Sequence, residues 1–390
     1  MPAEHRASGV PRLPCPDGPP PPELLEQAAA ALAAGRLIAV PTETVYGLAA
    51  RADRPAALQA LRQALGAAAD RGLVWHAPVQ NLEGGPAPLD FRFPAAPLAR
   101  RLAQRYWPGP LTLVVQGAPA GLEGLAQQGW LALRVPAQRG LQSLLARLPF
   151  PVAIAAAQRG DEPPATRAEQ VIERFGPSLA LCGDGGTTRI GQPSAMLALG
   201  PGRFELLRPG LLELADLRRT AGLRLAFVCT GNTCRSPMAE GLAQSLLLER
   251  LGAAGPAAVR GDPSADRSPR GRLSAFGFEL ASMGVAAAHG APASPQAVAV
   301  LAPRGIDLGG HQSQPATWER LADFDLALCL TRSHARALES LLPPGRGPRI
   351  ELLDPLGRDV PDPIGGDLEE YRRCAAAIEG ALRARLDLWG

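Results

Sequence analysis

The chain has 390 residues, 46% hydrophobic and 20% charged, which is enough for about two or three domains with sizeable cores. Its net charge of +3 does not by itself indicate nucleic acid, and all 40 basic residues are arginine, so lysine chemistry is excluded. The six cysteines lack the Cys-x2-Cys spacing of a structural zinc site and predict a cytoplasmic location. With no apolar run of about 18 residues, we expect no membrane partner, and we expect no metal or cofactor.

The N-terminal half is predicted to be an α/β domain that follows a proline-rich arm. Residues 1–22 contain four consecutive prolines and are predicted to be disordered. Over residues 23–215, helical and strand-like patterns alternate. The expected elements are a helix over 24–32 and strands at 37–40, 111–115 and 151–154.

The C-terminal half is predicted to be a doubly wound domain with a parallel sheet. After a connection over residues 216–223, a strand at 225–228 opens an alternation of strands and helices over residues 224–390. The last of these helices is expected over 368–388. Residues 252–275 are rich in Gly, Pro, Arg and Ser and are predicted to form a mobile insertion.

The octapeptide of residues 229–236 is the most informative segment of the chain. It places Cys229 and Arg235 in a Cys-x5-Arg spacing, on a loop between a predicted strand and a predicted helix. Loop amides and a helix N-terminus concentrate positive partial charge there, and the arginine adds two parallel donors for a phosphoryl group. That field favours a thiolate, which can attack phosphorus. Asn232, one of only two asparagines, suits a left-handed turn inside the loop.

A general acid is also needed, because the leaving group of a phosphoryl transfer must be protonated. Two Asp-Pro turns in the last 40 residues offer one, at Asp354 and at Asp362. The Gly-Gly that follows Asp362 permits close approach to a substrate and favours Asp362, while Asp354 stays open on the residues alone.

These residues resemble the low-molecular-weight protein tyrosine phosphatases over residues 223–390. The resemblance rests on segments in the family's order, which are Val228–Glu240, Ser282–Gly284, Gly305–Ser313, Ala322–Leu328 and Asp362-Pro363. It implies a cytoplasmic phosphoprotein phosphatase that works through a cysteinyl-phosphate without a metal. Cys229 would be the nucleophile, Arg235 the phosphate clamp, and Asp362 the general acid and then the base. The substrate-binding residues would be Thr230, Gly231, Asn232, Thr233, Cys234 and Ser236, with Ser236 also donating to the thiolate.

Three questions about this half stay open in the sequence. The threonine at position 233 makes the loop resemble that of protein-arginine phosphatases. Phosphotyrosine and phosphoarginine nevertheless both remain candidate substrates. Cys234 would form a protective disulfide with Cys229 under oxidation or serve only in packing. A thioredoxin-coupled arsenate reductase, the redox alternative, would need two neighbouring relay cysteines, whereas Cys329 and Cys374 are far apart in the sequence.

The other half, residues 23–213, resembles the YrdC/Sua5 threonylcarbamoyl-adenylate synthases. The segments that carry the resemblance are Pro41–Ala49, Trp107–Leu113, Arg134–Pro136 and Leu207–Gly210. It implies a twisted α/β domain whose basic cavity binds ATP, threonine and bicarbonate, and members of the family have been linked to RNA binding.

Departures from that family predict a domain that has lost catalysis. The family's Lys-x-Arg stands here as Leu65-Gly66-Ala67, its Ser-Ala-Asn as Ala156-Ala157-Gln158, and its Ser-Thr as Ser194-Ala195. The charge that would hold nucleotide phosphates is therefore missing unless Arg62 or Arg71 reaches into the cavity.

A residual ligand site is expected at Thr42, Arg134 and Ser194, for a nucleotide, an RNA or a partner. Two alternatives remain. One is a bifunctional protein with an active, tRNA-modifying synthase domain, and the other is a ligand- or RNA-binding regulatory protein in which phosphatase activity is incidental.

Overall fold

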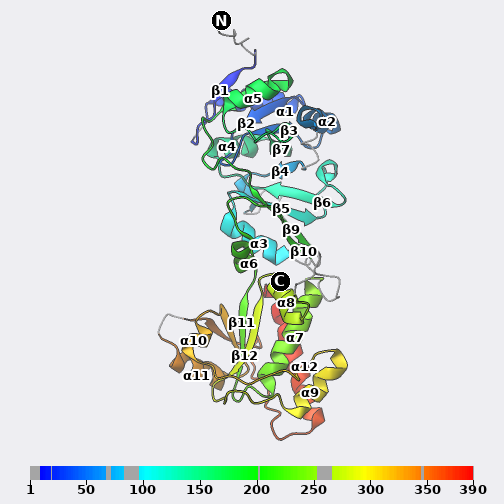
Figure 1. Ribbon diagram of the computed structural model, residues 1–390, viewed down its shortest axis with the longest axis vertical. Helices are drawn as coiled ribbons and strands as arrows, with labels where there is room; N and C mark the ends of the chain where they lie inside the picture. Colours follow the sequence, from blue (N-terminus) through cyan, green and yellow to red (C-terminus); the bar gives the residue numbers. More distant parts are fainter. Residues whose placement is uncertain are drawn as a thin grey trace. The chain divides into compact units, whose positions relative to one another are not determined.

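The computed structural model describes residues 9–18, 20–66, 72–82, 96–200, 203–252, 266–343 and 347–389. Contacts divide the chain into two compact units, of which the first holds most of residues 9–214 and the second most of residues 215–389. Both are α/β (Figure 1). In the described part of the chain, no helix is both long and apolar enough to cross a membrane.

The first unit is built on a mixed sheet, in which ten strands of the described residues run in the order β1-β8-β2-β3-β7-β4-β6-β5-β9-β10. The strands are β1 (Arg12–Pro14), β2 (Leu37–Val40), β3 (Gly47–Arg51), β4 (Val74–His76), β5 (Leu111–Gln116), β6 (Trp130–Arg134), β7 (Val152–Ala156), β8 (Leu179–Asp184), β9 (Ala195–Gly200) and β10 (Arg203–Arg208). The three strands expected at 37–40, 111–115 and 151–154 are confirmed as β2, β5 and β7, with small shifts at their ends.

Helices of the first unit bury apolar stripes against this sheet. They are α1 (Pro22–Ala33), α2 (Pro55–Leu65), α3 (Ala96–Tyr106), α4 (Arg139–Arg147) and α5 (Ala168–Phe175), with short 3-10 turns at η2 (Val79–Leu82), η3 (Glu123–Leu125) and η4 (Gly176–Ser178). One core cluster joins α1 and α4 to β2, β7 and β8, and it includes Leu25, Ile38 and Leu145. The helix expected over 24–32 is the buried part of α1.

The second unit is a parallel sheet of four strands in the described residues, in the order β12-β11-β13-β14. These are β11 (Arg224–Cys229), β12 (Glu279–Gly284), β13 (Leu326–Cys329) and β14 (Arg349–Leu352). The helices are α6 (Leu214–Ala221), α7 (Arg235–Arg250), α8 (Pro269–Ser274), α9 (Pro295–Leu301), α10 (Trp318–Leu321), α11 (Arg332–Leu341) and α12 (Leu368–Trp389), with one 3-10 turn, η5 (Ala302–Arg304).

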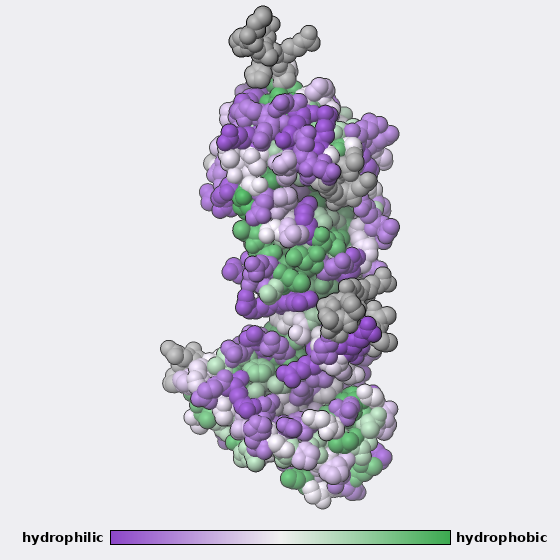
Figure 2. All heavy atoms as spheres, in the orientation of Figure 1, coloured by the Kyte–Doolittle hydropathy of each residue, from purple (hydrophilic) through white to green (hydrophobic). Residues whose placement is uncertain are grey.

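Helices cover both faces of the second sheet, α7 and α12 on one side and α10 and α11 on the other (Figure 1). The expected doubly wound parallel sheet is therefore confirmed, as are the first strand, in β11, and the last helix, in α12. The face seen in Figure 2 carries both hydrophilic and hydrophobic residues in each unit, while many of the apolar side chains are buried in the two cores.

Two expectations about irregular segments differ from the structure. The predicted disordered arm, residues 1–22, is wrong for residues 12–18, because β1 pairs with β8 and Cys15 is buried; residues 1–8 and 19 lie outside the described residues. The predicted insertion at 252–275 lies mostly outside the described residues, and its last part forms α8.

The anchor of the N-terminal segment is one buried glutamine. Gln138 caps α4, and its side-chain amide donates to the carbonyl oxygens of Cys15 (3.2 Å) and Pro16 (3.0 Å). These bonds hold the chain against the sheet before α1 begins.

Replacing this anchor tests whether residues 12–18 are docked. Gln138→Ala leaves two carbonyl oxygens without a donor, so the free energy of unfolding should fall by about 1–3 kcal/mol in chemical denaturation. The control is Gln27→Ala, which removes an exposed glutamine that bonds only within α1. Equal stability of the two variants would mean that the N-terminal segment is not held in this way.

Candidate functional site

The octapeptide 229–236, called here the cysteine loop, lies at the carboxyl end of the central strand of the second unit. Strand β11 is buried from Leu225 to Cys229, and α7 begins at Arg235, six residues after the cysteine. Ligands of open α/β sheets bind at the carboxyl ends of the strands, where the order of the strands reverses, as it does around β11. Helix α7 points its N-terminal amide groups toward the same place.

Cys229 is only 3% exposed, and its sulfur has two polar neighbours within the loop. The backbone N–H of Asn232 donates to it over 3.2 Å, and the hydroxyl oxygen of Ser236 lies 3.0 Å away. Ser236 also receives the side-chain amide of Asn232 (2.9 Å) and lies 3.2 Å from the carbonyl oxygen of Met283. When the sulfur is ionised it is the stronger acceptor for the serine proton, so Ser236 and the backbone N–H of Asn232 can both donate to a thiolate.

Asn232 holds the loop in shape. Its φ of 55° is left-handed, as the sequence predicts, and the residue is fully buried. Its side-chain oxygen accepts from the backbone N–H of Gln314 (2.8 Å), and its carbonyl oxygen lies 2.7 Å from Nε2 of His311. Burial lowers the pKa of His311, so the ring is neutral at neutral pH.

Arg235 and Asp362 meet beside the cysteine loop. The Arg235 guanidinium forms an ion pair with the Asp362 carboxylate and donates to the carbonyl oxygen of Val360 (3.3 Å). The arginine side chain is 6% exposed and the aspartate side chain 41%. Asp354 instead bonds to Arg358 and to its own turn. Of the two candidate acids, Asp362 is therefore the one in contact with Arg235.

The remaining loop residues form the walls of the site. The hydroxyl of Thr233 lies 3.6 Å from the Cys234 sulfur, which is 3.2 Å from the hydroxyl of Tyr371. Gly231 would tolerate a side chain, because an added Cβ would meet only Thr233, at 3.7 Å. Tyr371 is 2% exposed, and burial raises its pKa. It therefore packs under the loop and offers no stacking surface to a substrate.

The six cysteines are all free thiols in the described structure, so Cys229 and Cys234 are not joined. Cys329 is buried in β13, whereas Cys374 lies on α12 with its sulfur 3.6 Å from the carbonyl oxygen of Pro361. Burial raises the pKa of both Cys329 and Cys374 to about 12. Two inert thiols on different elements do not resemble a relay for arsenate reduction.

Sequence reasoning missed two histidines of this site. His311 falls in a segment used for the family resemblance, so its position was available as a signal. His334, on α11, lies 2.9 Å from the hydroxyl of Thr230, and no sequence pattern marks it.

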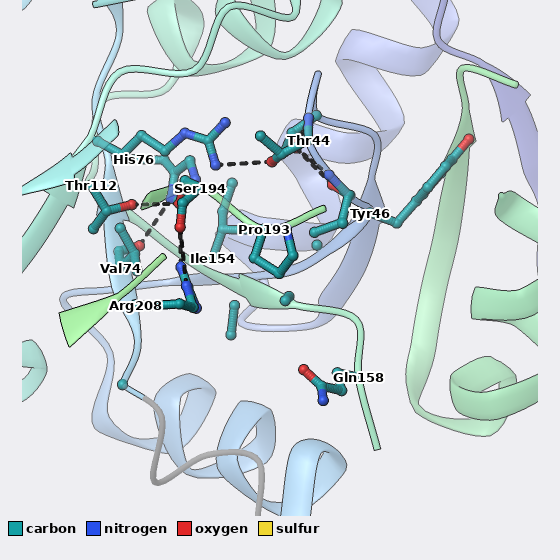
Figure 3. A pocket seen from close by; sticks show the side chains of 17 residues that line it. Thr44, Tyr46, Val74, His76, Thr112, Ile154, Gln158, Pro193, Ser194 and Arg208 are labelled. Carbon is teal, nitrogen blue, oxygen red and sulfur yellow. Dashed lines mark hydrogen bonds between the residues drawn. The ribbon is translucent and has the colours of Figure 1, made fainter. Parts of the chain in front are cut away.

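The first unit contains a pocket with a cavity of about 60 Å³ between the strands of its sheet (Figure 3). Its lining includes all three residues expected at a residual ligand site, which are Thr42, Arg134 and Ser194. Ala156 and Gln158, which stand where the synthase family has Ser and Asn, also line it. The three residues expected at a residual ligand site therefore line one pocket, and whether that pocket binds a ligand stays a prediction.

The polar groups of this pocket bond mostly to one another. Arg134 pairs with Glu43 and donates to the hydroxyl of Thr44 (3.0 Å) and to the carbonyl oxygen of Gly109 (3.0 Å). Arg134 and Glu43 are 5% and 4% exposed at their side chains. Breaking such a pair would leave an uncompensated buried charge, so Arg134 is held in place rather than offered to an anion.

Thr42 and Ser194 are engaged as well. The Thr42 hydroxyl donates to the carbonyl oxygen of Val45 (2.6 Å), and that of Ser194 lies 2.8 Å from Thr112 and 3.2 Å from Arg208 (Figure 3). Burial and the Arg134 charge lower the pKa of His76 to about 3, so it is neutral. The pocket thus carries hydroxyl groups and a neutral imidazole beside paired arginines.

Of the two arginines that could replace the lost Lys-x-Arg, the one within the described residues does not line the pocket. Arg62 donates to the carbonyl oxygen of Gly124 (2.9 Å) and is absent from the lining, so the alternative in which Arg62 reaches into the cavity is not found. Arg71 and Ala67 lie outside the described residues, whereas Leu65 is buried in the core.

Comparisons with known proteins match each half separately. The family model Sua5_yciO_yrdC, described as Telomere recombination, matches residues 30–210. The model for low molecular weight phosphotyrosine protein phosphatases matches residues 224–387.

Three curated relatives represent the two halves. Threonylcarbamoyl-AMP synthase of Bacillus subtilis is 35% identical over 201 residues, 51% of this chain and 56% of the relative. Putative threonylcarbamoyl-AMP synthase of Mycobacterium tuberculosis is 32% identical over 51% of this chain and 89% of the relative. Protein-arginine-phosphatase of Bacillus subtilis is 33% identical over 41% of this chain and 91% of the relative. The chain spans little more than half of the first of these relatives.

Two substitutions of Asn232 separate the contribution of its side-chain hydrogen bonds to stability from that of its left-handed backbone. Asn232→Gly keeps the left-handed backbone and removes the bonds to Ser236 and Gln314, so the free energy of unfolding should fall by about 1–3 kcal/mol. Asn232→Ala should cost about 1 kcal/mol more, because it adds left-handed strain.

The control is the same pair of substitutions at Gln128, the other non-glycine residue with positive φ in the described chain. At Gln128 the glycine variant should be as stable as the wild type in chemical denaturation. Only the alanine variant should lose about 1 kcal/mol of free energy of unfolding, because of left-handed strain. If Asn232→Gly is as stable as the wild type, the side-chain bonds do not support the loop.

Proposed function

Because the chain belongs to the Sua5/YciO/YrdC family over residues 30–210 and to the low molecular weight phosphotyrosine protein phosphatase family over residues 224–387, we propose that it is a phosphoprotein phosphatase with a non-catalytic first unit. The observation that carries the proposal is the cysteine loop. It gives the Cys229 sulfur two hydrogen-bonding neighbours and sets Arg235 against Asp362.

The first step is an in-line displacement at phosphorus. The phosphoryl group displaces the Asp362 carboxylate from Arg235, and the freed carboxylate takes up a proton from water. The Cys229 thiolate then forms a sulfur–phosphorus bond as the bond from phosphorus to the leaving group breaks, and Asp362 gives that proton to the leaving group. Arg235 and the loop amides hold the phosphoryl oxygens as charge develops on them. Arg235 pairs with Asp362 in this structure. When substrate binds, the phosphoryl group therefore replaces the Asp362 carboxylate as the hydrogen-bonding partner of the guanidinium.

The second step returns the enzyme to its starting state. Asp362, now a carboxylate, takes a proton from water while the water oxygen attacks the cysteinyl-phosphate. The sulfur–phosphorus bond breaks, orthophosphate leaves, and Cys229 is again a thiolate held by Ser236 and Asn232. Neither step needs an electron donor or acceptor.

Phosphoarginine is the substrate that the walls of the site favour. Thr233 and Thr230 are polar, and the exposed residue beside the acid is Ile364, 72% accessible, rather than an aromatic ring. Tyr371, the aromatic residue nearest that loop, is buried. A polar wall without a stacking partner suits a guanidinium better than a phenol.

The first unit is proposed to bind without catalysing. Its relatives are named as threonylcarbamoyl-AMP synthases, but the described pocket presents Arg134 already paired with Glu43, and Leu65 stands in the lost Lys-x-Arg motif. A nucleotide triphosphate needs several free cationic or amide donors. The pocket therefore suits a small polar ligand, and an RNA or protein partner remains an outcome for experiment.

The phosphatase proposal predicts that Cys229→Ser is inactive. The wild type should hydrolyse phosphoarginine peptides, and the serine variant should lose more than about a thousandfold in kcat/KM, measured by phosphate release. Cys329→Ala is the matched control, because it removes a buried thiol at the end of the neighbouring strand, and it should stay active. Equal hydrolysis by the wild type and Cys229→Ser would rule out the proposed nucleophile.

The proposal for the first unit predicts no heat of binding for a nucleotide triphosphate. Titration calorimetry of the full chain with ATP should give no saturable signal at millimolar ligand. The same protein incubated with ATP, L-threonine and bicarbonate should release no pyrophosphate. Micromolar binding with pyrophosphate release would instead support the bifunctional synthase.

A further inference from the structure

Thr230 is an exposed polar residue directly after a buried nucleophile. Cys229 is 3% exposed and Asn232 is fully buried, whereas Thr230 between them is exposed. Its carbonyl oxygen accepts the backbone N–H of Ala286 (2.9 Å). Gly284 comes so close that an added Cβ would lie 2.4 Å from the same oxygen. The backbone of Thr230 is therefore fixed, and what remains to be set is the direction of its hydroxyl.

His334 sets that direction from another element. It is the third residue of α11, is 3% exposed, and brings Nε2 to within 2.9 Å of the Thr230 hydroxyl. Its other ring nitrogen, Nδ1, lies 2.9 Å from the hydroxyl of Thr331, the residue that caps α11. Thr331 also has the hydroxyl of Ser333 at 2.8 Å. The four side chains form a chain of hydrogen bonds from the start of α11 to the cysteine loop.

The imidazole of His334, within this series of hydrogen bonds, is neutral. Burial and the nearby charge of Arg235 lower the pKa of His334 to about 4, against smaller opposing effects of Asp362 and Asp359. A neutral imidazole has one N–H donor and one acceptor nitrogen. One of the two threonine hydroxyls must therefore donate to the ring and the other must accept from it.

The donor–acceptor direction of these hydrogen bonds decides whether the Thr230 hydroxyl can offer a proton or only lone pairs to a substrate. If Nδ1–H donates to Thr331, then Nε2 accepts the Thr230 proton, and the lone pairs of Thr230 face the mouth of the site. If the sense is reversed, Thr230 keeps its proton as a donor. A guanidinium leaving group carries only N–H donors, whereas the bridging oxygen of a phenyl phosphate is an acceptor.

We propose that Thr230 and His334 together recognise the leaving group, with Thr230 donating to Nε2 of His334 and presenting its lone pairs to the N–H groups of a phosphoguanidinium. Thr230 is the group that contacts the substrate, and His334 is a positioning residue. The inference rests on the proposed phosphatase function, and it adds a specificity element outside the Cys229, Arg235 and Asp362 set.

The test compares two substrates in the full-length chain. A phosphoarginine peptide and a phosphotyrosine peptide of the same flanking sequence are assayed with the wild type, Thr230→Val, His334→Leu and the double variant. Each single variant should lose about tenfold in kcat/KM for phosphoarginine, the value of one hydrogen bond, and less than about threefold for phosphotyrosine. The double variant should lose no more than either single one, because the two residues act as a unit.

Conservative variants separate this role from folding. Thr230→Ser and His334→Gln keep a hydroxyl and a hydrogen-bonding amide, so they should recover most of the substrate ratio. Ser340→Ala removes a hydroxyl that bonds within the same helix, and it should leave the ratio unchanged. Equal thermal stability of Thr230→Val and wild type would exclude a general loss of structure.

Each other outcome overturns the inference. An equal loss on both substrates would mean a purely structural role, and a selective loss on phosphotyrosine would mean the reversed sense of the bonds. Additive losses in the double variant would mean that the residues act separately. If the wild type hydrolyses neither peptide, the proposed phosphatase function is wrong. If the wild type is active and the variants keep its ratio of kcat/KM for the two peptides, only the inference about Thr230 and His334 is wrong.

Discussion

The candidate catalytic geometry depends on the left-handed backbone at Asn232 and on the hydrogen bonds that hold it. With φ at 55°, the backbone N–H of Asn232 turns toward the Cys229 sulfur, and its side chain reaches Ser236. His311 and Gln314, which come from a distant segment of the chain, fix the other side of the same residue. The loop is therefore preorganised before a substrate arrives, which is what electrostatic stabilisation of a phosphoryl group requires.

Two arginine–carboxylate pairs explain why the halves of the chain differ in their proposed roles. In the first unit, Arg134 and Glu43 are both almost fully buried, so removing either partner would strand a charge in the protein interior. In the second unit, Asp362 is 41% exposed beside a buried Arg235. Water can solvate that aspartate when a phosphoryl group replaces it, so the pair is exchangeable. The same chemistry is thus structural in one unit and available for binding in the other.

Local patterns in the sequence predict those parts of the structure that local forces determine. Buried apolar runs identify β2, β5, β7 and β11 because their residues bury both faces, and a rare asparagine in a loop identifies the left-handed turn. The strand at Arg12–Pro14 has no periodicity, and its order comes from pairing with β8, from the ion pairs of Arg12 with Glu169 and Asp184, and from the bonds of Gln138 to the residues that follow it. His334 likewise acquires its position beside Thr230 across 104 residues of sequence. Long-range contacts of this kind leave no pattern in a single sequence.

The central claim is that Cys229 carries the phosphoryl group, and trapping that intermediate tests it most directly. Asp362→Ala slows the release of phosphate, because no base activates the attacking water. After mixing this variant with a phosphoarginine peptide and quenching in acid, peptide mass spectrometry should find one phosphoryl group on the peptide that contains Cys229. Release of phosphate with no label on that peptide, or with label on another residue, would contradict the account.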